Sequence, residues 1–189
     1  MRIAMCLLCV LAAQAAAAVE IAGVKLEDKV KLGANELVLN GAGVRTKIVF
    51  KVYVGALYLP ARGASTEDVL GQKGAKRVSM TLLRDLTAQQ LVDALNEGIR
   101  ANQSPAELAK LDERMRQLEA TMRAIGAAKQ GSIVTLDFLP ESGTRVTVDG
   151  AEKGKPIAGE DFYNALLRIW LGDDPVDASL KKAMLGQAR

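Results

Sequence analysis

A helix signal that begins at Ser104 restricts the possible folds of this sequence more than any other feature. In Ser104-Pro105-Ala106-Glu107 the serine can cap a helix, the proline suits its first position, and the glutamate can reach back to the capping backbone. Apolar residues then recur every three or four positions along about 20 residues and form one stripe. They are Leu108, Leu111, Met115, Leu118, Met122 and Ile125. We expect this stripe to pack against a sheet; a partner helix or a membrane surface is the alternative.

The remaining segments predict strands before this helix and a hairpin and more helices after it. Runs rich in Val, Leu and Ile, separated by Gly, Asn or Pro, indicate strands. They are 19–26, 29–39, 49–59 and 77–83, and the later segments 132–139 and 144–148 flank a turn. Helices are predicted from the capping box at Thr87 to about Arg100, over 162–171, and from Asp177 to Leu185. Such segregation favours an α+β fold with an antiparallel sheet covered by helices.

Residues 1–18 have the pattern of an export signal. A positive start at Met1 and Arg2 precedes an apolar core, and Ala16-Ala17-Ala18 suits cleavage. The core is short for a transmembrane anchor, which is the alternative interpretation. We therefore predict a signal peptide at 1–18, a single domain at 19–189, and a periplasmic or secreted protein without stable membrane insertion.

The composition excludes several kinds of chemistry. Both cysteines, Cys6 and Cys9, lie within 1–18, and the sequence has no histidine. The mature chain therefore lacks disulfides, Ser-His-Asp and Cys-His nucleophile systems, and the commonest ligands of zinc, copper and iron. We predict neither a metal nor a cofactor. The formal net charge of +3 is dispersed and aromatic residues are scarce, so nucleic acid is not an expected partner.

Arg45 is the most informative candidate for a functional site. It follows Asn40-Gly41-Ala42-Gly43-Val44 and precedes the predicted strand 49–59. A guanidinium group can donate two parallel hydrogen bonds to a carboxylate or an enolate. The glycines are not a dinucleotide fingerprint, because Thr46 replaces the third glycine and a strand follows instead of a helix. We expect Gly41 and Gly43 to provide a turn or a bulge.

Two separated segments resemble the chalcone isomerase superfamily. Residues 40–45 followed by 51–59 are similar to its amino-terminal signature, and residues 165–177, continuing to Leu185, resemble its closing helices. The resemblance implies an open-faced β-sandwich, in which a large antiparallel sheet packs against a layer of helices and a cleft opens between them. Members include enzymes that cyclise chalcones, plant fatty-acid-binding relatives and exported bacterial proteins; the signal peptide points to the bacterial group.

The resemblance also assigns roles to individual positions. Arg45 matches the arginine that polarises the carbonyl of the substrate in the enzymes. Tyr53 stands where the enzymes have a water-positioning threonine, and Ile169 where they have a threonine or serine. Their tyrosine and asparagine of the first helix fall near Gln90 or Leu91 and near Glu97 or Gly98. Isomerisation of chalcones is therefore not expected, although an intramolecular lyase acting on another substrate, with Arg45 as its catalytic residue, stays open.

The resemblance to the fatty-acid-binding members implies that Arg45 and Tyr53 together hold a carboxylate. We therefore favour a binding protein for fatty acids or similar amphiphilic carboxylates, and a noncatalytic envelope partner protein is a further alternative. The competing structural interpretation pairs Arg45 with an internal acid and makes Tyr53 a half-buried strand aromatic. Alternation places Tyr58 on the opposite face from Tyr53. We expect Phe162, Tyr163 and Trp170 to pack the last long helix, and one of them is a candidate to line the cleft.

Overall fold

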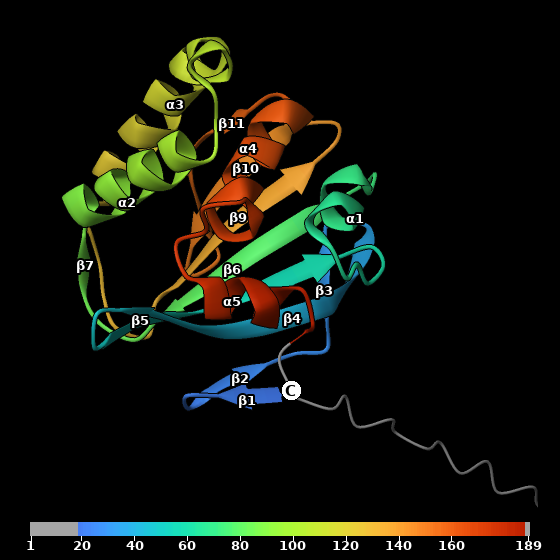
Figure 1. The fold of residues 1–189 in the computed structure, drawn as a ribbon. Helices are drawn as coiled ribbons and strands as arrows, with labels where there is room; N and C mark the ends of the chain where they lie inside the picture. The colour runs from blue at the N-terminus through green and yellow to red at the C-terminus, as the bar shows by residue number, and fades with distance from the viewer. Residues whose placement is uncertain (1–18, 188–189) are drawn as a thin grey trace, which may run out of the picture.

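The fold is built on a seven-stranded antiparallel sheet with the strand order β11-β10-β9-β6-β5-β4-β3. The computed structural model describes residues 19–187, so the signal peptide predicted at 1–18 lies outside the described residues. The strands are β3 (Lys29–Leu32), β4 (Asn35–Lys47), β5 (Phe50–Leu59), β6 (Lys76–Leu82), β9 (Ile133–Leu139), β10 (Gly143–Val148) and β11 (Ala151–Ile157). The helices α2 (Ala88–Ala101), α3 (Pro105–Ile125) and α4 (Glu160–Leu171) lie over one face of this sheet (Figure 1). The predicted α+β fold is confirmed.

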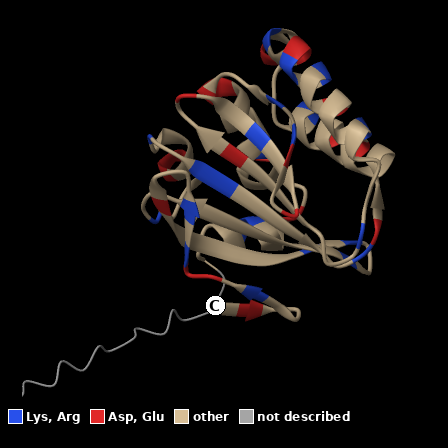
Figure 2. Cartoon of the chain, turned by 180° about the vertical axis from the view of Figure 1, so that it is seen from behind, with Lys and Arg blue, Asp and Glu red and all other residues tan. Residues whose placement is uncertain are grey.

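Both predicted capping boxes are present. The hydroxyl of Ser104 accepts from the backbone of Glu107, whose carboxylate accepts in return, and Thr87 and Gln90 form the same arrangement at α2. The apolar stripe of α3 faces the core, since Leu111, Met115, Leu118 and Met122 are buried. The helix contacts α2 and β11. Acidic and basic residues are interspersed along the same helix (Figure 2). No described helix is both long enough and apolar enough to cross a membrane.

Some predicted boundaries were wrong. The segment 19–26 is not one strand but a hairpin of β1 (Val19–Ile21) and β2 (Val24–Leu26), which turns at Ala22 and Gly23 with positive φ angles. The segment 29–39 is divided by a turn at Gly33 into β3 and the start of β4. Strand β11, the short β7 (Leu86–Thr87) and β8 (Ala127–Ala128), and α1 (Thr66–Gly71) were not predicted. Strand β11 has a largely exposed sequence with little apolar alternation, and the other missed elements are six residues long or shorter.

The glycine run is part of a strand and not of a loop. Strand β4 continues through it to Lys47, so Arg45 lies within β4. Glycine normally weakens a strand, but here it allows α5 (Ala178–Met184) to lie directly on β4. A Cβ atom at Gly41 would collide with the carbonyl oxygen of Ala183, and one at Gly43 would lie 2.7 Å from the Cβ of the same residue. The glycines are therefore needed for close approach of a helix.

The predicted bulge is also present, next to Gly41. The register of β4 against β5 shifts between Leu39 and Gly41. The buried side chain of Asn40 at this point donates to the carbonyls of Gly63 at 3.0 Å and Met184 at 2.7 Å, and accepts from the Gly63 amide at 2.7 Å. The bulged residue therefore links β4, the loop after β5 and the end of α5.

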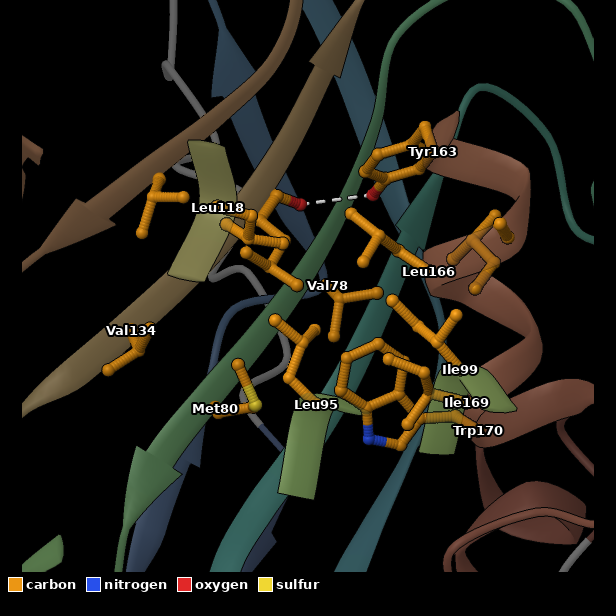
Figure 3. Packing of buried hydrophobic residues seen from close by; sticks show 14 of the residues in the cluster. Val78, Met80, Leu95, Ile99, Leu118, Val134, Tyr163, Leu166, Ile169 and Trp170 are labelled. Atoms are coloured by element: carbon orange, nitrogen blue, oxygen red, sulfur yellow. Dashed lines mark hydrogen bonds between the residues drawn. The ribbon is translucent and has the colours of Figure 1, made fainter. Parts of the chain in front are cut away.

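The main hydrophobic core lies between the sheet and the helices. Figure 3 shows side chains of β6, α2 and α4 converging there. Phe162, Tyr163 and Trp170 are all buried, as predicted for the last long helix. The hydroxyl of Tyr163 donates to the carbonyl of Leu136 at 3.0 Å, and its ring stacks on Phe138. Tyr58 belongs to a second cluster on the opposite face, which confirms its separation from Tyr53.

All three tyrosines of the chain are buried, which predicts an unusual alkaline titration. Burial raises the pKa of Tyr58 to about 12 and raises the pKa values of Tyr53 and Tyr163 above the ordinary tyrosine range. In the unfolded chain these hydroxyls ionise at about pH 10. Above that pH the unfolded chain releases protons that the folded chain keeps, so the free energy of unfolding falls as the pH rises. We expect tyrosinate absorbance and loss of circular dichroism to appear together in an alkaline titration. A tyrosinate signal near pH 10 in a protein that keeps its native spectrum would contradict this expectation.

Candidate functional site

Arg45 and Tyr53 are direct neighbours across the β4–β5 ladder. The Cζ atom of Arg45 lies 5.6 Å from the centroid of the Tyr53 ring, which is within the range of a cation–π interaction. Tyr53 belongs to the core between the sheet and the helices, so the pair lies on the helix-facing side of the sheet. The two residues that the sequence selected are therefore side by side.

Trp170 of α4 determines how the Tyr53 hydroxyl can act. The indole Nε1 donates to the Tyr53 Oη at a distance of 2.7 Å. An indole can only donate, so the tyrosine oxygen is the acceptor and its own proton is left for another acceptor. Burial raises the pKa of Tyr53, against the opposing effects of Arg45 and Trp170. The hydroxyl therefore keeps its proton at neutral pH and can serve as a donor.

Arg45 does not take part in any ion pair among the described residues. Its Nε atom is buried and has no hydrogen-bond partner within the described part of the chain. Asp177 is close enough to influence the pKa of Tyr53, but its carboxylate is bound to backbone amides and not to Arg45. Its carboxylate accepts from the backbone amides of Thr46, Ser179 and Leu180, and thereby caps α5. The alternative in which Arg45 is neutralised by an internal acid is therefore not what the structure shows.

A cavity of about 340 Å³ opens beside the pair, between the sheet and the helices. Its buried lining is apolar apart from the Arg45–Tyr53–Trp170 group; it comprises Val52, Met80, Leu82, Leu95, Met122, Val134, Leu136 and Ile169. Figure 3 shows Met80, Leu95, Val134, Ile169 and Trp170 around this space. The volume lies within the range of about 300 to 1,000 Å³ that is usual for small-molecule sites.

The mouth of the cavity has polar side chains on the side of α2, and apolar and basic side chains on the side of the β4–β5 hairpin. Its exposed residues are Lys47, Ile48 and Phe50 from the β4–β5 hairpin, Arg84 after β6, and Gln90, Asp93 and Glu97 from α2. An apolar interior with few polar groups and a polar rim suits an amphiphilic ligand whose head group reaches the buried pair. Among the described residues, no group of three or more acidic side chains is arranged to hold a metal ion.

The positions that correspond to the isomerase residues also surround the cavity. Ile169, Gln90, Leu91 and Glu97 all line it, whereas Gly98 packs against Ile169. None of these four lining positions holds the tyrosine or the asparagine that the resemblance to the enzymes implies. Sequence reasoning did not identify the bond from Trp170 to Tyr53, because no pattern connects residues so distant in the chain.

The comparisons with known proteins agree with this architecture. The chalcone isomerase-like family matches residues 18–186. Among solved structures, a fatty-acid binding protein of Arabidopsis thaliana is similar with a TM-score of 0.67 and 15% identity, and the match covers 89% of this chain and 96% of that chain. No curated protein matches the sequence. The match of the family over nearly the whole described chain shows that this protein belongs to the chalcone isomerase-like family.

Proposed function

We propose that the protein binds fatty acids or similar amphiphilic carboxylates, with the head group on Arg45 and Tyr53. One observation carries this proposal: a half-buried guanidinium, whose Nε atom is buried without a partner among the described residues, and a buried hydroxyl with a free proton lie together at an apolar cavity. A carboxylate can accept from both groups at once, since it has two acceptor oxygens. The ligand would thereby supply a partner for the buried Nε atom of Arg45, which has none among the described residues.

The alkyl chain and the head group of such a ligand contribute to the binding free energy in different ways. Each methylene group that moves from water into the apolar cavity contributes about 0.8 kcal/mol. Hydrogen bonds to the charged head group contribute about 1.5 to 3 kcal/mol. The alkyl chain thus supplies most of the affinity, and the Arg45–Tyr53 pair selects for a carboxylate and fixes its orientation.

Two further considerations support the proposal. The Arabidopsis protein of the same fold is described as a fatty-acid binding protein, so this fold can hold such a ligand. The apolar core and the cleavage pattern in residues 1–18 support export, and we propose a periplasmic or secreted location for the mature chain. The isomerase alternative is less favoured, because Ile169 stands where the enzymes have a threonine or serine and adds no hydroxyl to the cavity.

A comparison of dodecanoate with dodecanol tests the proposal. The two ligands share an alkyl chain and differ at the head group that Arg45 and Tyr53 would contact. We expect the wild-type protein to prefer the acid by about 10- to 150-fold in titration calorimetry, which corresponds to the charge-assisted hydrogen bonds. Equal affinities for the acid and the alcohol, or no binding of either, would refute the proposed role of the pair.

A further inference from the structure

The tip of the β4–β5 hairpin is unusually apolar and exposed. Ile48, Val49 and Phe50 expose 88%, 77% and 57% of their surface, and these are among the few large apolar residues of the described chain that face solvent. Adjacent exposed apolar side chains at one point of a surface are typical of an interaction site. No packing requirement within the protein explains them.

The backbone of this tip is also unfavourable for its sequence. Ile48 has a φ angle of 60°, in the left-handed region. It is the first residue of a two-residue turn between β4 and β5, where glycine or asparagine is usual and a β-branched residue is disfavoured. This residue is both strained and 88% exposed, so it adds little to the stability of the isolated protein, and strain of this kind is concentrated at functional sites.

Basic residues surround the apolar tip. Lys47 and Lys51 flank it on the hairpin, and the Cζ atom of Arg84 lies 5.0 Å from the centroid of the Phe50 ring. None of these three cations forms an ion pair with a residue in the range 19–187. The nearby Asp85 is already paired with Lys129 at 3.0 Å. The hairpin side of the mouth is therefore basic as well as apolar.

We propose that the β4–β5 hairpin tip docks on a lipid bilayer that contains anionic lipids. Apolar side chains flanked by cations suit this surface, because the side chains enter the headgroup region while the cations face the anionic lipids. The acidic residues of the mouth, Asp93 and Glu97, lie on α2, so the hairpin and not α2 faces the bilayer. Since Lys47, Ile48 and Phe50 also line the mouth, docking would place the opening of the cavity at the lipid surface.

Docking would allow a fatty acid to pass between the bilayer and the cavity, and this consequence rests on the proposed function. Docking itself is measured without any fatty acid. The probe is a vesicle of phosphatidylcholine with phosphatidylglycerol, compared with phosphatidylcholine alone, in a flotation assay. We expect the wild-type protein to bind the anionic vesicles and to lose binding as the salt concentration rises.

Val49 and Lys51 allow a test that leaves the cavity intact, because neither of them lines it. We expect Val49→Asp to weaken vesicle binding at least tenfold and Lys51→Gln about fivefold, with unchanged affinity for dodecanoate in solution. Val19→Asp on the β1–β2 hairpin is the matched control, since Val19 is 42% exposed, and it should bind vesicles as the wild type does.

Three results would overturn docking at this tip. The first is wild-type protein that does not bind anionic vesicles, and the second is Val49→Asp that binds them as tightly as the wild type. The third is a dimer in solution that Val49→Asp dissociates in the absence of vesicle binding, which would assign the tip to a second copy of the chain. Wild-type protein that binds anionic vesicles but not dodecanoate would count against the proposed function and not against docking.

Discussion

Arg45→Ala is expected to weaken the binding of dodecanoate by about 10- to 150-fold, because it removes the charge-assisted hydrogen bonds to the head group. The fold should not suffer. The Nε atom of Arg45 is buried without a partner, and the substitution breaks no ion pair of the described residues and removes only the cation–π contact with Tyr53. The affinity for dodecanol should change little, since the alcohol gains little from the guanidinium. Titration calorimetry with both ligands measures the two effects.

Arg84→Ala is the matched control for this substitution. Arg84 is another cavity-lining arginine, but it is exposed at the mouth and lies over the ring of Phe50. Its loss should change the affinity for soluble dodecanoate by less than about threefold, as expected for an exposed charge. If Arg84→Ala weakened binding as much as Arg45→Ala, the head group would be at the mouth and the inner pair would have another role.

Gly41→Ala is expected to reduce the free energy of unfolding by about 3 kcal/mol, the upper end of the range for overpacking. The new Cβ would collide with the carbonyl oxygen of Ala183 and approach the Gly186 amide and the Met184 carbonyl to 2.9 Å. These are backbone atoms, so no side-chain rotation relieves the collision and α5 must move off β4. Urea unfolding followed by circular dichroism measures the change.

Gly71→Ala is the control, because a Cβ at Gly71 would meet nothing within 4 Å and its backbone is in an ordinary helical conformation. This substitution should leave stability unchanged or raise it by about 0.4 to 1 kcal/mol, through the unfolded state. Equal stabilities of Gly41→Ala and the wild type would show that the close contact of α5 with β4 is not required for the fold.

Local signals in the sequence located α2 and α3, whereas the short α1 was missed although Ser65 and Asp68 form a capping box there too. The capping boxes at Thr87 and Ser104 involve residues three positions apart, so their geometry follows from the sequence alone. The glycines of β4 could not be understood in this way, because the helix that needs them begins at Ala178. The same limitation explains why the predicted strand 29–39 ended before Gly41: the glycines suggested a turn or a bulge, whereas β4 continues through them to Lys47.

The candidate site was only partly accessible to sequence reasoning. The resemblance to the chalcone isomerase superfamily selected Arg45 and Tyr53, and the two residues are indeed paired across β4 and β5. Nothing in the sequence indicates that Trp170 donates to the Tyr53 hydroxyl and so leaves its proton free. The lack of an acidic partner for Arg45 among the described residues is likewise visible only in the folded chain, where three backbone amides engage the carboxylate of Asp177.

A crystal structure of the protein with bound dodecanoate would show directly whether Arg45 and Tyr53 hold the carboxylate. We expect a carboxylate oxygen within about 2.7 to 3.0 Å of both the Arg45 guanidinium and the Tyr53 Oη, the usual length of charge-assisted hydrogen bonds. Its alkyl chain should lie along the apolar lining near Met80, Val134 and Leu136. A carboxylate held at the mouth by Lys47 or Arg84, with the Arg45 guanidinium out of contact, would contradict the account.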